Sequence, residues 1–279
     1  MSFRSLISAA ELAAHLDDPN WIVVDCRFSL ADPGAGRRMY AEAHLPGARF
    51  ADLDDDLSSS ITPTSGRHPL PDPDAFRNRL GEWGIDSSVQ VVAYDDSGGA
   101  LAARMWWLLR WMGHRAVAIL DGGYSAWTSA GLTTTAEVPT PARREFTGKP
   151  DSSLWLTTDE LARALDANEV LLIDAREVER FRGETEPIDP VAGHVPGAIN
   201  LPFAENIGND RRFCSPEELR RRFTAVIGDR GSIVSMCGSG VTACHNLLAL
   251  EIAGFPDARL YAGSWSEWIR DPARGVATE

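Results

Sequence analysis

A cysteine followed by small and hydroxyl residues is the stretch of this sequence whose residue types could do chemistry. Cys237 follows the apolar run 233–236 and precedes Gly238, Ser239 and Gly240. Glycines let a backbone turn tightly and approach a ligand closely, and successive N–H groups in such a loop form an anion-binding nest. These groups, with the positive end of a following helix, would stabilise a thiolate. We therefore predict that Cys237 is a reactive thiol, in preference to the alternative that it is a small buried core residue.

The residues on either side of this loop predict the elements that position it. Apolar strands and helical segments alternate along the chain, which predicts an α/β fold with mainly parallel sheets flanked by helices. Ligands in such folds bind beyond the carboxyl ends of the strands, and Cys237 stands at such an end. The predicted strands are 21–25, 89–94, 116–120, 170–174, 232–236 and 258–261, and the predicted helices are 9–16, 76–83, 100–112, 158–165, 216–223 and 243–253.

The sequence also repeats itself. The pattern His-x-Pro-Gly-Ala occurs twice, and other strand and turn segments recur in the same order at an offset of about 140 to 150 residues, which is the size of a domain. We predict two similar domains, at 1–130 and 155–279, joined by a proline-containing linker at 131–154. Asp95 stands in the first repeat where Cys237 stands in the second, so we predict that the first domain is catalytically silent.

Composition limits the possible partners. The net charge of −13 argues against non-specific nucleic-acid binding, and no apolar run approaches membrane-spanning length. The N-terminus lacks a signal-peptide pattern. The four cysteines form no CxxC pair and have no zinc-ligand spacing with histidine, so we predict no metal or other cofactor. A reducing cytoplasm is the predicted location.

Together these features resemble the tandem-domain members of the rhodanese family of sulfurtransferases, over nearly the whole chain. The loop 237–243 is similar to that of members that use 3-mercaptopyruvate, whereas members that prefer thiosulfate typically carry basic residues where this chain has Gly238 and Ser239. The resemblance implies that the thiolate of Cys237 takes sulfur from a small-molecule donor and forms a persulfide. The sulfur then passes to an acceptor thiol, such as that of thioredoxin, or to cyanide. This agrees with the covalent chemistry expected of an activated nucleophile.

The resemblance also implies residue roles. Arg180 matches the position that holds the donor's carboxylate, a role that suits the forked guanidinium group. Ser239, His68 and Asp54 match three residues that assist proton transfer. The loop residues that would surround the substrate are Gly238, Gly240, Val241 and Thr242.

Each role has a simpler alternative. Arg180 could be a surface arginine that pairs with Glu177 or Glu184, His68 a solvated loop residue, and Asp54 a member of an acidic run.

One position departs from the family pattern. Asp189 stands where 3-mercaptopyruvate enzymes carry a second substrate-binding arginine, nine residues after Arg180. This predicts that the second arginine is missing or is supplied from elsewhere in the chain, by Arg182 or Arg211.

Three other functions also depend on a modifiable cysteine. A thiosulfate sulfurtransferase would use the same nucleophile, and a non-enzymatic persulfide carrier or scaffold would need only a modifiable Cys237. A cysteine phosphatase or arsenate reductase would need an arginine six positions after the cysteine to stabilise the transferring group, and that residue is Ala243.

Overall fold

The computed structural model describes residues 2–228 and 232–278. They form two compact units, each built on one five-stranded sheet. The first unit comprises residues 2–59, 70–151 and 209–213, and the second comprises the described residues of 60–69, 152–208 and 214–278. Segment 60–69 therefore belongs to the second unit, although it lies in the N-terminal half of the sequence.

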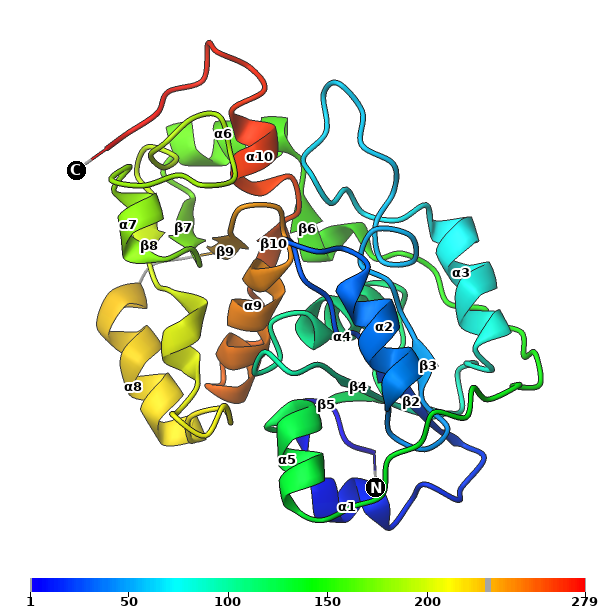
Figure 1. The fold of residues 1–279 in the computed structure, drawn as a ribbon. Helices are drawn as coiled ribbons and strands as arrows, with labels where there is room; N and C mark the ends of the chain where they lie inside the picture. Colours follow the sequence, from blue (N-terminus) through cyan, green and yellow to red (C-terminus); the bar gives the residue numbers. More distant parts are fainter. Residues whose placement is uncertain (1, 229–231, 279) are drawn as a thin grey trace. The chain divides into compact units, whose positions relative to one another are not determined.

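The first unit is a parallel sheet with flanking helices (Figure 1). Its strand order is β1-β5-β4-β2-β3, and every pairing is parallel. The central strand β4 is buried along its whole length, as expected for an apolar strand covered on both faces. The elements are β1 (Leu6–Ile7), α1 (Ala9–Ala13), β2 (Trp21–Asp25), α2 (Ala35–Glu42), β3 (Arg49–Phe50), α3 (Pro73–Glu82), β4 (Gln90–Tyr94), α4 (Ala102–Trp111), β5 (Val117–Leu120) and α5 (Gly123–Ser129).

The second unit repeats this topology. Its strand order is β6-β10-β9-β7-β8, again with parallel pairings throughout, so β9 occupies the place that β4 has in the first sheet. Helices α8 and α9 pack against each other, and α9 packs against β9 (Figure 1). The elements are η1 (Ser152–Leu154), β6 (Trp155–Leu156), α6 (Thr158–Asp166), β7 (Val170–Asp174), α7 (Val178–Phe181), β8 (Ile199–Asn200), η2 (Phe203–Asn206), α8 (Pro216–Ile227), β9 (Ser232–Met236), α9 (Thr242–Ile252), β10 (Arg259–Tyr261) and α10 (Ser264–Trp268).

The predicted fold class is thus confirmed. The predicted strands 21–25, 170–174 and 232–236 agree with β2, β7 and β9 at both ends. Two-residue strands at the sheet edges and the short helices α2, α5, α7 and α10 were not predicted, since such short segments carry too few positions to show a periodic pattern. None of the helices in the described residues has the length and apolar character that crossing a bilayer requires.

A buried ion pair recurs at the same place in both sheets. Arg27 pairs with Asp25 at 2.6 Å, and Arg176 pairs with Asp174 at 2.6 Å. Each arginine also donates to a main-chain carbonyl of the segment that leads to the sheet's edge strand. A pair that recurs in both repeats and ties strand to loop stabilises the local fold.

The repeated histidines are structural as well. His44 stacks on Tyr40 and His194 stacks on Phe181, with ring centroids 3.9 and 3.7 Å apart. In each case Nδ1 lies within hydrogen-bonding distance of the main-chain carbonyl of the stacked residue.

The segment predicted as a linker packs on the first unit over much of its length. Phe146 is buried, Arg144 donates its N–H to the carbonyl of Gly81, and Asp151 donates to that of Trp111. This segment therefore contributes to the first unit's core before the chain enters β6.

Candidate active site

Cys237 lies at the carboxyl end of β9, in the short loop before α9. Its Sγ is buried and accepts the N–H of Gly240 at 3.1 Å. The main chain of the loop is fixed by the start of α10: Cys237 N–H donates to Ser264 Oγ, and its carbonyl accepts from Trp265 N–H. The predicted strand, loop and helix are therefore confirmed, and the thiol faces at least one main-chain donor.

Gly240 is required by the shape of this loop. Its φ of +79° lies in the region that favours glycine, and a Cβ at this position would lie 2.4 Å from the carbonyl oxygen of Ala262. Because that obstacle is main chain, no side-chain rotation relieves it.

We expect Gly240→Ala to displace the loop and remove the N–H donor from the sulfur, with at least a tenfold loss of activity and a loss of stability. The backbone conformation alone costs about 1–2 kcal/mol for a residue with a side chain. Gly197→Ala is the matched control, since Gly197 has a φ of +81° with nothing within 4 Å of the added Cβ. Thermal unfolding and turnover of both variants test this: if Gly240→Ala retains as much turnover and stability as Gly197→Ala, the loop tolerates the change and the requirement for glycine is wrong.

Ser239 and His68 are brought together, as the resemblance implies. His68 Nδ1 lies 2.7 Å from Ser239 Oγ, and both side chains are buried. The alternative that His68 is a solvated loop residue is therefore wrong. A buried serine–histidine pair beside a thiol is a suitable arrangement for proton transfer.

Asp54 belongs to the first unit. Burial raises the pKa of Asp54, and the neighbouring carboxylates of Asp52 and Asp55 raise it further. Its participation with His68 and Ser239 stays a prediction.

Arg180 is anchored in the second unit at the end of α7. Its Nε and Nη2 contact the carboxylate of Glu186 at 2.7–3.2 Å, and Nη2 is also 3.2 Å from Asp189. Burial alone would raise the pKa of Glu186, but Arg180 and nearby main-chain N–H groups lower it. Arg180 is thus not a surface arginine that pairs with Glu177 or Glu184. Its guanidinium group lies 3.5–3.6 Å from the Cβ position that a side chain at Gly238 would occupy.

Arg67 also lies beside the thiol loop, although no sequence motif predicts it. Its Nη1 contacts Asp189, and its Nη2 lies 2.9 Å from the same Cβ position at Gly238. Arg67 immediately precedes the predicted site residue His68, and this adjacency is the one sequence feature that could have indicated its place near the loop.

The two arginines suggested as a replacement clamp have other partners. Arg182 has a side chain that is 53% exposed and its ion-pair partner is Glu184, at 3.9 Å. Arg211 belongs to the first unit, where it donates to the carbonyl of Asp96. Asp189 itself is buried against Arg67 and Arg180, and burial raises its pKa while the two guanidinium groups oppose that effect.

Val241 and Thr242 form the junction between loop and helix. Val241 is the N-cap residue of α9 and is buried, and Thr242 is the first helical residue. Both are placed next to the thiol loop in the chain, and their contact with a substrate stays a prediction.

The first unit has a carboxylate where the second has the thiol. The side chain of Asp95 accepts four main-chain N–H groups at 2.8–2.9 Å, from Ser97, Gly99, Leu101 and Ala102. Burial raises the pKa of Asp95, and these hydrogen bonds oppose the effect. The main-chain N–H groups of a loop of this type therefore form an anion-binding site, which in the first unit is occupied by the side chain of Asp95.

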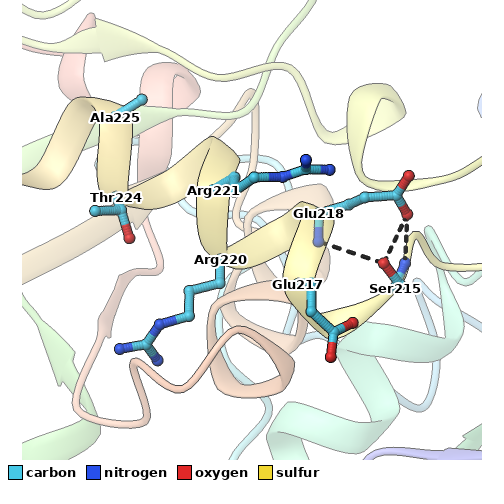
Figure 2. A pocket seen from close by; sticks show the side chains of 7 residues that line it. All are labelled: Ser215, Glu217, Glu218, Arg220, Arg221, Thr224 and Ala225. Atoms are coloured by element: carbon cyan, nitrogen blue, oxygen red, sulfur yellow. Dashed lines mark hydrogen bonds between the residues drawn. The ribbon is translucent and has the colours of Figure 1, made fainter.

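A separate depression lies along α8 (Figure 2). Its seven lining residues, from Ser215 to Ala225, include none of the thiol loop. Ser215 and Glu218 in this depression form a capping box, in which Ser215 Oγ accepts the N–H of Glu218 at 3.3 Å. Both polar side chains thus serve the start of the helix.

Comparisons with known proteins agree with this architecture. The family model described as "Rhodanese-like domain" matches residues 8–130 and 157–271. The chain is 53% identical to a "Probable 3-mercaptopyruvate sulfurtransferase" of Pseudomonas aeruginosa, across 100% of this chain and 99% of that protein. It is 41% identical to a "Putative thiosulfate sulfurtransferase" of Mycobacterium tuberculosis, across 97% and 96% of the two chains. The solved structure of the 3-mercaptopyruvate sulfurtransferase from Leishmania major has a TM-score of 0.83 and 33% identity, covering 95% of this chain and 74% of that one.

Proposed function

Because the chain belongs to the rhodanese family, we propose that it is a sulfurtransferase that moves the sulfur of 3-mercaptopyruvate to a thiol or to cyanide through a persulfide on Cys237. The observation that carries the proposal is the thiol loop itself: Cys237 Sγ faces a main-chain donor and is followed by a serine paired with a buried histidine. Similarity to proteins named as sulfurtransferases favours an enzyme over a non-enzymatic persulfide carrier.

In the first half-reaction, the Cys237 thiolate attacks the sulfur of the donor. An S–S bond forms and the donor's C–S bond breaks, which leaves the electron pair on carbon as the enolate of pyruvate. The enolate must be stabilised and protonated. Ser239 donates the proton and His68 replaces it, and the participation of Asp54 in this proton transfer stays a prediction.

In the second half-reaction, the acceptor attacks the outer sulfur of the persulfide, and the electron pair of the S–S bond returns to Cys237 as the thiolate. The Gly240 N–H stabilises negative charge on the Cys237 sulfur. A reducing compartment such as the cytoplasm, with a small protein thiol of the thioredoxin kind as acceptor, suits this chemistry. No disulfide joins the four cysteines in the described residues.

Thiosulfate is the second candidate donor, because some relatives are named for it. The loop argues against it as the preferred donor. A basic loop would suit a dianion, whereas Gly238 and Ser239 are neutral.

Mass spectrometry tests the persulfide directly. Protein incubated with 3-mercaptopyruvate, without acceptor, is expected to release about one equivalent of pyruvate and to carry one additional sulfur atom on the peptide that contains Cys237. Subsequent addition of a thiol should remove that sulfur. Pyruvate release without a modified Cys237 would overturn the proposed mechanism.

Arg180→Ala is expected to lower kcat/KM for 3-mercaptopyruvate. The loss of transition-state stabilisation should equal the contribution of a charged hydrogen bond, about 1.5–3 kcal/mol. Removal of the guanidinium also leaves Glu186 and Asp189 with fewer partners, and burial makes that costly for the fold. Thermal unfolding therefore accompanies the kinetics.

Arg180→Lys serves as the control for the fold, because it retains the charge but lacks the fork, and it should recover only part of the activity. Unchanged kinetics in both variants would show that the carboxylate is held by other residues.

A further inference from the structure

Two guanidinium groups converge on the thiol loop at Gly238. Nη2 of Arg67 is 2.9 Å, and Nη1 and Nη2 of Arg180 are 3.6 and 3.5 Å, from the Cβ position that Gly238 leaves empty. Gly238 directly follows the proposed nucleophile in the chain. The missing side chain therefore lets both guanidinium groups approach the loop closely, because a Cβ at Gly238 would collide with Nη2 of Arg67.

Arg67 is held in this place by its main chain as well as by its side chain. Its N–H donates to Ser266 Oγ at 3.0 Å, and the N–H of Ser266 donates to the carbonyl of Gly238 at 2.9 Å. One residue of α10 thus fixes both the loop and the segment that carries Arg67. Such anchoring gives the guanidinium group a defined position before any ligand arrives.

Arg67 also has an unused donor. Its Nη1 is committed to Asp189, but its Nε is buried and has no hydrogen-bond partner among the described residues. A buried donor without a partner costs stability, and such a group in a native protein is best explained by a ligand or water that completes it. On Arg180, by contrast, Nε and Nη2 are taken by Glu186 and Asp189, and Nη1 is the nitrogen left to face the loop.

The formal charges of the residues beside Gly238 balance. Three arginines and three carboxylates form one connected group of ion pairs. We call it the arginine cluster, and its members are Arg67, Arg176, Arg180, Asp174, Glu186 and Asp189. A balanced cluster binds an anion through directed N–H groups and not through a large net positive charge, which suits a singly charged carboxylate better than a dianion.

We propose that Arg67 is a second residue that binds the donor's carboxylate, in a clamp with Arg180, and that Asp189 positions both guanidinium groups by bridging them. The proposal rests on the proposed function, since it assigns the anion of that donor to a place beside Cys237. It gives Asp189 a role in the site and makes the donor's single negative charge a determinant of specificity.

The clamp is tested without turnover by alkylation of Cys237. The matched reagents are 3-bromopyruvate, which carries the carboxylate, and its neutral ethyl ester, and alkylation is measured on the Cys237 peptide by mass spectrometry. In the native protein the anionic reagent should react faster relative to the ester than it does with a free thiol. Arg67→Ala should slow the anionic reagent by roughly tenfold to a hundredfold, the range for one charged hydrogen bond, and leave the ester nearly unchanged. Arg67→Lys should restore part of the difference, and Arg182→Ala, which changes an exposed arginine, should match the native protein.

The outcomes separate this proposal from the proposed function. If Arg67→Ala slows both reagents equally or neither, Arg67 serves only to hold segment 60–69, and the clamp is wrong. If neither reagent modifies Cys237 in the native protein, the proposed nucleophile fails instead. The kcat/KM for 3-mercaptopyruvate should be highest in the native protein, lower in Arg67→Lys and lowest in Arg67→Ala.

Discussion

Replacing Cys237 with serine is expected to abolish sulfur transfer from either donor while leaving the fold intact. The loss should be roughly 10⁴-fold or more, because a serine hydroxyl is a far weaker nucleophile than a thiolate and the covalent intermediate cannot form. Serine is close to cysteine in size, and the buried position should accept it with the loop's main-chain hydrogen bonds retained. Steady-state assays with 3-mercaptopyruvate and with thiosulfate measure the loss, and thermal unfolding checks the fold.

The other three cysteines provide the matched controls. Alanine at Cys26, Cys214 or Cys244 should leave most activity. Cys244 is the most informative of these, because its Sγ donates to the carbonyl of Gly240 at 3.3 Å and so contacts the same loop. Substantial activity in Cys237→Ser, or its loss in Cys244→Ala with a stable fold, would contradict the assignment of the nucleophile.

The second large effect is a difference between donors. Ser239→Ala and His68→Ala should lower kcat for 3-mercaptopyruvate by roughly 10²–10⁴-fold, the usual contribution of a positioned proton donor. Thiosulfate turnover should fall by less than about tenfold, because sulfite leaves without needing a proton. The physical basis is the 2.7 Å contact between Ser239 Oγ and His68 Nδ1, which would give the enolate of pyruvate a proton source.

Parallel losses with the two donors would contradict this role, since they would indicate a general distortion of the loop. Ser239→Ala is the cleaner variant because it removes only a hydroxyl. His68 lies in a segment that other contacts also hold on the second unit, including Gly66 N–H to Glu267 at 3.2 Å. Thermal unfolding of His68→Ala shows whether that segment remains in place.

The sequence alone predicted the fold well because its signals are local. The buried strands β2 and β7 are apolar runs that end in aspartate, and β9 is mainly apolar with serines at 232 and 235; the ends of all three agree with the prediction. The prediction of two similar domains needed only the sequence as well, because the pattern His-x-Pro-Gly-Ala occurs in both halves. The two-residue edge strands were missed because pairing with a neighbouring strand, and not composition, defines them.

The site was predicted only in part, because some of its contacts join residues far apart in the sequence. The resemblance placed Ser239 and His68 together, and the structure agrees. In the sequence, Asp189 is visible only as the loss of an arginine. Its contact with Arg67, at a separation of 122 residues, depends on segment 60–69 joining the second unit, and no periodicity encodes that.

The central claim is that this chain prefers 3-mercaptopyruvate as its sulfur donor. Steady-state kinetics with 3-mercaptopyruvate and thiosulfate side by side, each with a thiol acceptor and with cyanide, test it most directly. We predict a higher kcat/KM for 3-mercaptopyruvate with both acceptors. A higher kcat/KM for thiosulfate would contradict the account and identify the protein as a thiosulfate sulfurtransferase.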